Sequence, residues 1–211
     1  IVGPKMRFFV EDAQNLKSDE LLLYCWRGGM RSSSMAWLFE IYGIRTKTLT
    51  RGYKAYRKYI RESFNWPYKV LIIGGLTGSG KTEILDTLEN EGEQVLNLER
   101  IANHKGSAFG ALGQAEQPSN EHFENLIAQV WLSFNKEKVI WIEDESHSIG
   151  SVWIPDPLFA KMRASKVVQI ECKHEERIQR LVNDYARFPN EKLEHIIQKI
   201  SKRLGGQNVK K

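Results

Sequence analysis

Short apolar runs alternate with segments of helical periodicity along the chain. Apolar runs bounded by polar residues predict buried strands at residues 20–25, 46–50, 69–73, 94–98, 139–143 and 167–171. Apolar residues spaced three and four positions apart predict helices at residues 31–42, 81–91, 120–134, 175–185 and 191–204. Strands that alternate with helices indicate an α/β fold, in which a parallel sheet is covered by helices on both faces and joined by right-handed crossovers.

The pattern divides near Asn65-Trp66-Pro67, because the residue before a proline is disfavoured in helices. We expect one domain over residues 1–66 and a second over residues 67–211, ending in a frayed tail at 205–211. No apolar run approaches the roughly 20 residues that cross a bilayer. Residues 1–10 lack the apolar core of a signal peptide.

The two cysteines, Cys25 and Cys172, are too few for a disulfide framework and lack a metal-ligand spacing. This favours a reducing, cytoplasmic setting, in which we expect Cys172 to be a packing residue. The net charge of +5 is uneven, since residues 1–67 hold 12 Lys and Arg against 6 Asp and Glu. A basic end fits a polyanionic partner such as RNA, although solvated charge on surface helices explains the same counts.

A phosphate-binding motif joins the strand at 69–73 to the helix at 81–91. Residues 75–82 follow the Walker A pattern G-x-x-x-x-G-K-[ST]. Loop amides would cradle phosphate oxygens, Lys81 would supply positive charge and Thr82 would hold Mg²⁺. The motif indicates a di- or triphosphate group and leaves its identity open. The residues predicted to bind phosphate are Gly75, Thr77, Gly78, Ser79, Gly80, Lys81 and Thr82.

Acidic residues end the strand predicted at 139–143. Glu143 and Asp144 stand where carboxylates beside a phosphate loop orient Mg²⁺ or its water. Helix capping or simple solvation is the alternative explanation for both residues. We expect Mg²⁺ to accompany the phosphate ligand, and no tightly bound metal or cofactor.

Cys25 begins a loop between the strand at 20–25 and the helix at 31–42. Loop amides, the helix N-terminus and the charges of two arginines would stabilise a thiolate, which is a ready nucleophile. Two glycines would let the backbone wrap round an anion. The Cys-x5-Arg spacing is shared by rhodanese-like sulfurtransferases and by phosphatases that form a cysteinyl phosphate. The predicted catalytic residues are Cys25, Arg27, Gly28, Gly29 and Arg31.

Further segments are distinctive in combination with these two loops. They are the cysteine loop at 24–32, a basic and aromatic stretch at 51–57, the phosphate loop at 75–82, and residues 102–110, 117–119, 141–146 and 149–150. In this order they resemble the tRNA 2-selenouridine synthase family. The resemblance implies a partial rhodanese-like domain followed by a P-loop NTPase-like domain with a parallel sheet flanked by helices.

The resemblance also implies a reaction on tRNA that carries 2-thiouridine at the wobble position. Geranyl diphosphate alkylates the sulfur, and selenophosphate then replaces the S-geranyl group by selenium. Cys25 would serve the selenium step, and residues 75–82 would bind the diphosphate. RNA contacts are implied for Arg51, Tyr53, Lys54, Tyr56, Arg57, His104 and Lys105, for which a plain structural role is the alternative.

Two features depart from the family pattern. A complete rhodanese domain has roughly 100 residues with its cysteine late, whereas Cys25 lies early. Family members also continue beyond the position of Gly206, so we expect an internal fragment or a shortened member. Two other functions stay open: a Cys-x5-Arg phosphatase fused to a P-loop kinase-like module, and a non-catalytic RNA-binding remnant.

Overall fold

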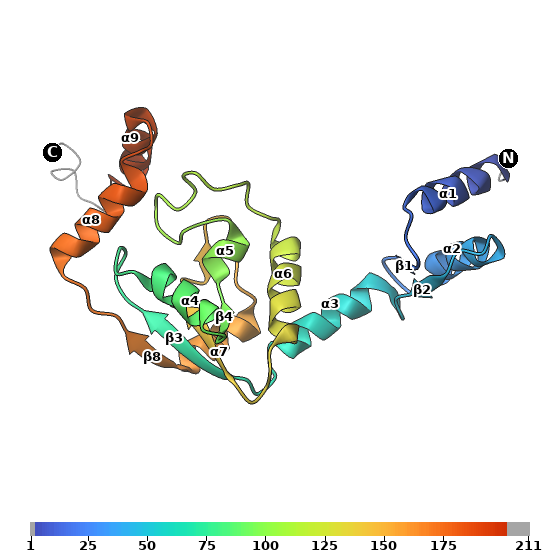
Figure 1. The fold of residues 1–211 in the computed structure, drawn as a ribbon, viewed down its shortest axis with the longest axis horizontal. Coiled ribbons are helices and arrows are strands. Elements are labelled where there is room, and N and C mark those ends of the chain that lie inside the picture. The colour runs from blue at the N-terminus through green and yellow to red at the C-terminus, as the bar shows by residue number, and fades with distance from the viewer. Residues whose placement is uncertain (1–2, 202–211) are drawn as a thin grey trace. The chain divides into compact units, whose positions relative to one another are not determined.

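The computed structural model describes residues 3–201 (Figure 1). The chain divides into two compact units, Ile1–Glu62 and Ser63–Lys211. The tail expected at 205–211, and the end of the last predicted helix, lie outside the described residues. Within residues 3–201, no helix combines the length and the apolar character that crossing a membrane requires.

The first unit builds a small parallel sheet against two helices. Strands β1 (Leu21–Leu23) and β2 (Thr46–Thr48) are joined by α2 (Met30–Ile41). These three elements match the strand–helix–strand series predicted from the sequence. The apolar pattern does not predict α1 (Gly3–Asn15) or α3 (Gly52–Ser63). The α1 and α2 helices share a core of buried side chains, namely Val10, Ala13, Leu38 and Phe39.

Within residues 63–201, four parallel strands form the sheet of the second unit in the order β4-β5-β3-β8. They are β3 (Lys69–Gly74), β4 (Gln94–Leu96), β5 (Val139–Glu143) and β8 (Lys166–Gln169). Apolar and β-branched side chains dominate these segments, as suits parallel strands. The predicted parallel sheet is therefore confirmed, and the carboxyl ends of β3, β4 and β5 meet at one edge.

Helices α4 (Lys81–Asn90), α6 (Asn120–Ser133) and α7 (Asp156–Ala164) pack against the sheet. On one face, Leu85 of α4 packs with Ile73 and Val95. On the other, side chains that alternate with these, such as Ile72, Leu96 and Ile142, are fully buried. The sheet is flanked by helices as predicted, and all four residues of its edge strand β8 are exposed.

Five further elements complete the described part of the second unit. They are α5 (Leu98–Ala102), the antiparallel pair β6 (Ser148–Ile149) and β7 (Val152–Trp153), α8 (His174–Tyr185) and α9 (Asn190–Lys199). Among these, α8 and α9 appear in orange and red in Figure 1. No residue within either of these two described helices is buried.

The Gln117 side chain ties the long segment between α5 and α6 to the β6–β7 turn. Its Nε2 donates to the carbonyl oxygens of Ala102 and Ile149, each at 3.0 Å. Its Oε1 accepts the backbone N–H of Ser151 at 2.8 Å. The next element begins at once, since the Ser119 hydroxyl caps α6. These bonds fix a segment that would otherwise be a long irregular loop.

Candidate functional site

The cysteine loop lies between β1 and α2. Cys25 follows the strand by two residues, and Gly29 is the N-cap of α2. Gly28 and Gly29 have φ angles of 61° and 90°, in the left-handed region. The backbone N–H of Gly29 donates to the Arg27 carbonyl oxygen at 2.6 Å. The chain therefore turns from strand to helix within a few residues around the cysteine.

Hydrogen bonds surround the Cys25 thiol. It donates to the Arg27 carbonyl oxygen at 2.8 Å and accepts from the Ser32 hydroxyl at 3.7 Å. Burial acts to raise the pKa of the Cys25 thiol, but hydrogen bonds from the Ser32 side chain and the loop backbone outweigh burial and lower this pKa to about 7. About half of such a cysteine is nucleophilic thiolate at neutral pH.

Ser32 is a residue of this site that the sequence analysis does not single out. It is buried in the first turn of α2, and its hydroxyl also donates to the Gly29 carbonyl oxygen at 2.9 Å. Loop amides, the helix N-terminus and the charges of Arg27 and Arg31 are all predicted to stabilise the thiolate, and both arginines lie exposed. The hydrogen bonds that lower the pKa come from Ser32 and from backbone groups. A hydroxyl in the first turn after the cysteine is the signal that identifies Ser32.

Residues 51–57 form the start of α3 and contact the cysteine loop. The ring centroid of Tyr53 lies 5.9 Å from that of Tyr24, 5.5 Å from that of Trp26 and 5.9 Å from that of Tyr56. Tyr24 and Trp26, on either side of Cys25, are 62% and 50% exposed. An aromatic cluster with accessible rings therefore joins the start of α3 to the two residues that flank Cys25 in the chain. Arg51 and Lys54 are exposed on the 51–57 segment, and Arg57 is half-buried.

The phosphate loop joins β3 to α4, the context that its motif requires. Lys81 is the first residue of α4, and its Nζ donates to the Gly75 carbonyl oxygen at 2.8 Å. The Ser79 hydroxyl is buried and has no hydrogen-bond partner among residues 3–201. A buried hydroxyl without a partner is costly, and an oxygen of a bound phosphate would satisfy it.

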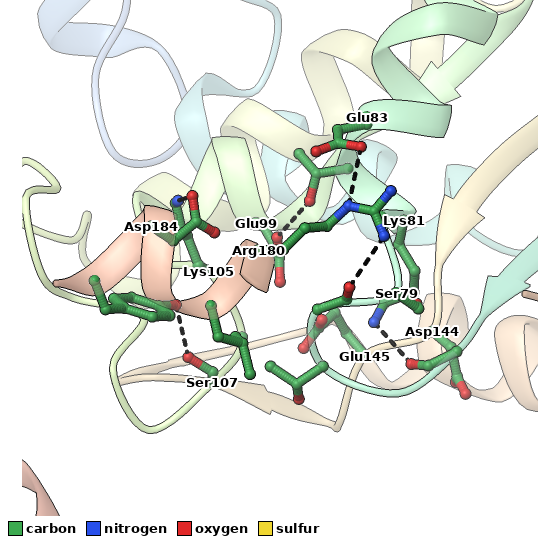
Figure 2. A pocket seen from close by; sticks show the side chains of 18 of the residues that line it. Ser79, Lys81, Glu83, Glu99, Lys105, Ser107, Asp144, Glu145, Arg180 and Asp184 are labelled. Atoms are coloured by element: carbon green, nitrogen blue, oxygen red, sulfur yellow. Dashed lines mark hydrogen bonds and ion pairs between the residues drawn. The ribbon is translucent and has the colours of Figure 1, made fainter. Parts of the chain in front are cut away.

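A cavity of about 480 Å³ lies over this loop (Figure 2). Its walls come from the phosphate loop, from the segments that follow β4 and β5, from residues 105–107 and from α8. On the acidic side stand Glu99, Asp144 and Glu145. The structure brings all the predicted phosphate-binding residues to this cavity: Gly75, Thr77, Gly78, Ser79, Gly80, Lys81 and Thr82.

The two predicted acidic residues have different surroundings. Asp144 lines the cavity and forms an ion pair with Arg163 of α7. Glu143 is 2% exposed, and its carboxylate accepts the backbone N–H of Glu99 at 2.7 Å. Burial raises the pKa of the Glu143 carboxyl to about 7, against the effect of backbone hydrogen bonds. Glu143 thus fixes the backbone at Glu99, and Asp144 is the member of the pair that faces the cavity.

Glu99 and Glu145 complete the acidic wall and are missed by the sequence analysis. The Thr82 hydroxyl donates to the Glu99 carboxylate at 3.4 Å, and Glu99 shares a hydrogen bond with Glu145. Burial raises the pKa of both carboxyls, and the charge of Glu99 adds to this effect on Glu145, whose pKa rises to about 8. Glu99 follows the end of β4, and Glu145 follows the end of β5. The signal that singles out Glu143 is an acidic residue at the carboxyl end of a strand beside a phosphate loop, and this signal applies to Glu99 as well.

His104 and Lys105, two of the predicted RNA contacts, lie in the second unit. His104 is 9% exposed, and burial lowers the pKa of its imidazole. Its ring packs so closely on Gly110 that a Cβ there would lie 2.7 Å from it. The Nζ of Lys105 lies 3.4 Å from Asp184, and Lys105 lines the phosphate cavity. His104 therefore has a packing role, and Lys105 belongs to the cavity wall.

Comparisons with known proteins agree with this arrangement. The family model for the tRNA 2-selenouridine synthase AAA domain matches residues 68–211. A tRNA 2-selenouridine synthase from Hydrogenovibrio crunogenus is 35% identical over 216 residues, which cover 92% of this chain and 58% of the relative. One from Pseudomonas fluorescens is 37% identical over 208 residues, which cover 88% of this chain and 56% of the relative.

A tRNA 2-selenouridine synthase from Psychromonas ingrahamii is 36% identical over 173 residues, which cover 81% of this chain and 46% of the relative. The chain thus spans about half the length of the curated relatives that it matches. The family model covers more than half of the chain, including the phosphate loop and every wall of its cavity. The chain belongs to the tRNA 2-selenouridine synthase family.

Proposed function

We propose that this chain carries the cysteine loop and the phosphate site of an enzyme that converts wobble 2-thiouridine in tRNA into 2-selenouridine. The observation that carries the proposal is the presence, in one chain of this family, of a cysteine with a pKa of about 7 and a P-loop cavity. The chain spans only part of its relatives, so activity, substrates and partners are all included in the proposal.

The first step is alkylation of the base. The sulfur of 2-thiouridine attacks C1 of geranyl diphosphate, the carbon–oxygen bond breaks, pyrophosphate leaves and N3 of the base loses its proton. The amides of residues 75–82 and the Ser79 hydroxyl would bind the diphosphate, and Lys81 would offset the charge on the departing pyrophosphate. The buried Ser79 hydroxyl without a partner among the described residues, and the presence of Lys81 and Thr82 in the cavity lining, support this use of the cavity.

Mg²⁺ would accompany the diphosphate. This ion prefers oxygen ligands, keeps several waters and needs few protein ligands beside substrate phosphates. The Thr82 hydroxyl and the Glu99 carboxylate, 3.4 Å apart, have the donor atoms that it takes. Among the described residues, no group of three or more His, Cys, Asp or Glu side chains could hold a metal ion alone. When bound, Mg²⁺ would neutralise charge on the diphosphate.

The second step is replacement of sulfur by selenium. Selenium of selenophosphate attacks C2 of the base, the carbon–sulfur bond breaks and geranyl thiol leaves. Water then cleaves the selenium–phosphorus bond and releases phosphate. Cys25, supported by Ser32 and by the loop glycines, would act on selenophosphate, and Arg27 and Arg31 would attract this anion. Prior alkylation helps because a neutral thiol leaves more readily than a sulfide anion.

The substrate tRNA would contact the first unit beside Cys25. Single-stranded RNA is held by stacking of splayed bases on aromatic rings and by cations on phosphates. The exposed rings of Tyr24 and Trp26 and the exposed cations Arg51 and Lys54 supply both kinds of contact. The cluster supports a role for residues 51–57 in binding the anticodon loop.

The test is a nucleoside assay. The 211-residue chain and the longer H. crunogenus relative are each incubated with 2-thiouridine-containing tRNA, Mg²⁺ and geranyl diphosphate, with and without selenophosphate. The tRNA is digested and its nucleosides are identified by mass spectrometry. Variants Cys25→Ser and Lys81→Ala are compared with Cys172→Ser as the matched cysteine control.

We expect S-geranyl-2-thiouridine in the absence of selenophosphate and 2-selenouridine in its presence. Lys81→Ala should block the first product, Cys25→Ser only the second, and Cys172→Ser neither. No nucleoside change with either protein would overturn the proposal. If Cys25 instead releases phosphate from a phosphomonoester, the phosphatase alternative, which the Cys-x5-Arg spacing also fits, takes its place.

A further inference from the structure

Helix α8 forms one wall of the phosphate cavity. Arg180, Leu181, Asn183, Asp184 and Tyr185 all line it. Figure 2 shows Arg180 reaching from this helix toward the phosphate loop that carries Ser79 and Lys81. The apolar spacing predicts a helix at residues 175–185 but no ligand-binding role for it. The Arg180 guanidinium is therefore a cation of the site that the Walker A pattern does not include.

Two arginines attach α8 to the phosphate loop. Arg177 Nε donates to the Thr77 carbonyl oxygen at 3.0 Å, and Arg180 NH1 donates to the Gly78 carbonyl oxygen at 3.4 Å. Gly78 has a φ of 80°, and a Cβ at this position would lie 2.8 Å from the Arg177 carbonyl oxygen. The close approach of the helix thus depends on the glycine at this position of the loop.

The other end of α8 is fixed by different residues. The Tyr185 hydroxyl forms a hydrogen bond of 3.1 Å with the Ser107 hydroxyl, and Asp184 pairs with Lys105 at 3.4 Å. The Phe109 ring lies 5.4 Å from that of Tyr185. Because α8 is held at both ends, Arg180 has a defined place over the loop rather than a free surface position.

The acidic lining of the cavity explains why a bound diphosphate needs a second cation. Among the described lining residues, six are acidic and three are basic. Of the basic residues, Lys105 is paired with Asp184, which leaves Lys81 and Arg180 nearest the phosphate loop. Arg180 also faces Glu83, at 3.4 Å, and its NH1 lies 3.2 Å from Cys172 Sγ. A diphosphate in an acidic cavity needs positive charge from more than one side.

We propose that Arg180 is a binding residue for the diphosphate, contacting its terminal phosphate from α8 while Lys81 contacts it from the phosphate loop. This proposal rests on the proposed function of the cavity. The donors that now reach the Gly78 carbonyl would turn to a phosphate oxygen, because charge-assisted hydrogen bonds to phosphate are stronger than bonds to a neutral carbonyl. The planar guanidinium suits two phosphate oxygens at once, a geometry that a lysine does not offer.

The test is titration calorimetry of the whole chain with inorganic pyrophosphate and Mg²⁺. We expect Arg180→Ala to weaken binding about 10- to 100-fold, as for loss of a charged hydrogen bond, and Arg180→Lys to weaken it less. The matched control is Arg187→Ala, because Arg187 is exposed just beyond α8 and contacts the Phe188 ring instead of the cavity. Both alanine variants lower the net charge equally, so Arg187→Ala should bind as the unchanged chain does.

The outcomes separate this inference from the proposed function. If Lys81→Ala abolishes binding while Arg180→Ala and Arg187→Ala bind equally, the phosphate site stands and the role of Arg180 is refuted. If the unchanged chain does not bind pyrophosphate, both fail. Unliganded melting temperatures that agree between the two alanine variants, together with weaker binding in Arg180→Ala alone, establish a ligand contact rather than a folding effect.

Discussion

The backbone N–H of Tyr53 donates a hydrogen bond of 2.8 Å to the carbonyl oxygen of Cys25. The adjacent N–H of Lys54 bonds the carbonyl oxygen of Trp26 at 3.1 Å. The first backbone N–H groups of a helix have no partner within the helix, and those of α3 thus satisfy carbonyl groups of the cysteine loop. The basic and aromatic segment at 51–57 therefore has a structural function, to hold the loop, in addition to its predicted contacts with RNA.

Gly52 should be essential for this contact. Its φ is 70°, and a Cβ would collide with the Cys25 carbonyl oxygen. We expect Gly52→Ala to reduce stability by about 2–4 kcal/mol, from left-handed strain and steric overlap together. Gly43→Ala is the control, because Gly43 has a similar φ of 76° but nothing within 4 Å. It should cost only about 1 kcal/mol. If chemical denaturation shows that Gly52→Ala and Gly43→Ala lower the free energy of unfolding equally, the steric role of Gly52 is contradicted.

The reactivity of Cys25 should depend on Ser32. Alkylation by iodoacetamide follows the thiolate, so its rate in a Cys172→Ser background should rise with pH around a midpoint near 7. Ser32→Ala removes one hydrogen bond to the sulfur, which should raise the pKa of Cys25 and slow alkylation at pH 7 about 2- to 10-fold. Ser34→Ala is the control, since that hydroxyl donates to the Met30 carbonyl oxygen. A midpoint that does not move in Ser32→Ala would refute the assignment.

The cysteine loop was predictable in outline and not in its interactions. A strand, a cysteine, two glycines and a helix follow from local patterns, because each depends on neighbours in sequence. The bond from Tyr53 to Cys25 joins residues far apart in sequence, and no periodicity indicates it. The apolar spacing does not predict α3, because basic and aromatic residues dominate its first two turns.

The phosphate site shows the same division. The Walker A pattern places Lys81 and Thr82 because the motif is contiguous. Glu99 and Arg180 reach the cavity from a neighbouring strand end and from a distant helix, so their roles depend on the strand order β4-β5-β3-β8. The exposed surface of β8 was also unpredictable, because an apolar run of this length is compatible with both a covered strand and an edge strand.

Burial of Glu143 should make the fold lose stability as pH rises from about 4.3 to about 7. The pKa of its carboxyl is raised to about 7 in the folded chain, so the folded state binds this proton more tightly than the unfolded state. The resulting stability is fully present below the unfolded pKa of about 4.3 and is lost as pH rises through 7. Glu143→Gln should remove this loss while its Oε1 still accepts from Glu99, and should be more stable at pH 8 by about 1–3 kcal/mol.

The comparison for Glu143→Gln is Glu93→Gln, which changes the same charge at an exposed position. Urea denaturation at pH 5, 6.5 and 8 measures all three proteins. Glu93→Gln should follow the unchanged chain at every pH, whereas the advantage of Glu143→Gln should grow between pH 5 and pH 6.5 and level off above about pH 7. If Glu143→Gln is more stable than the unchanged chain by the same amount at pH 5 as at pH 8, ionisation of the Glu143 carboxyl is not the cause.

Contacts of α3 with tRNA should depend on Lys54 and not on Lys58. Both lysines are exposed on the same helix, but Lys58 Nζ is paired with Glu62 at 3.6 Å. Each phosphate contact releases about one counterion, so Lys54→Ala should weaken tRNA binding and reduce the slope of log K against log salt by about 1. Lys58→Ala should leave the slope unchanged. Filter binding between 50 and 200 mM salt, roughly the range in which such slopes are resolved, measures both. Equal slopes for the two variants would mean that this face of α3 does not touch the RNA backbone, and its aromatic residues would then serve the cysteine loop alone.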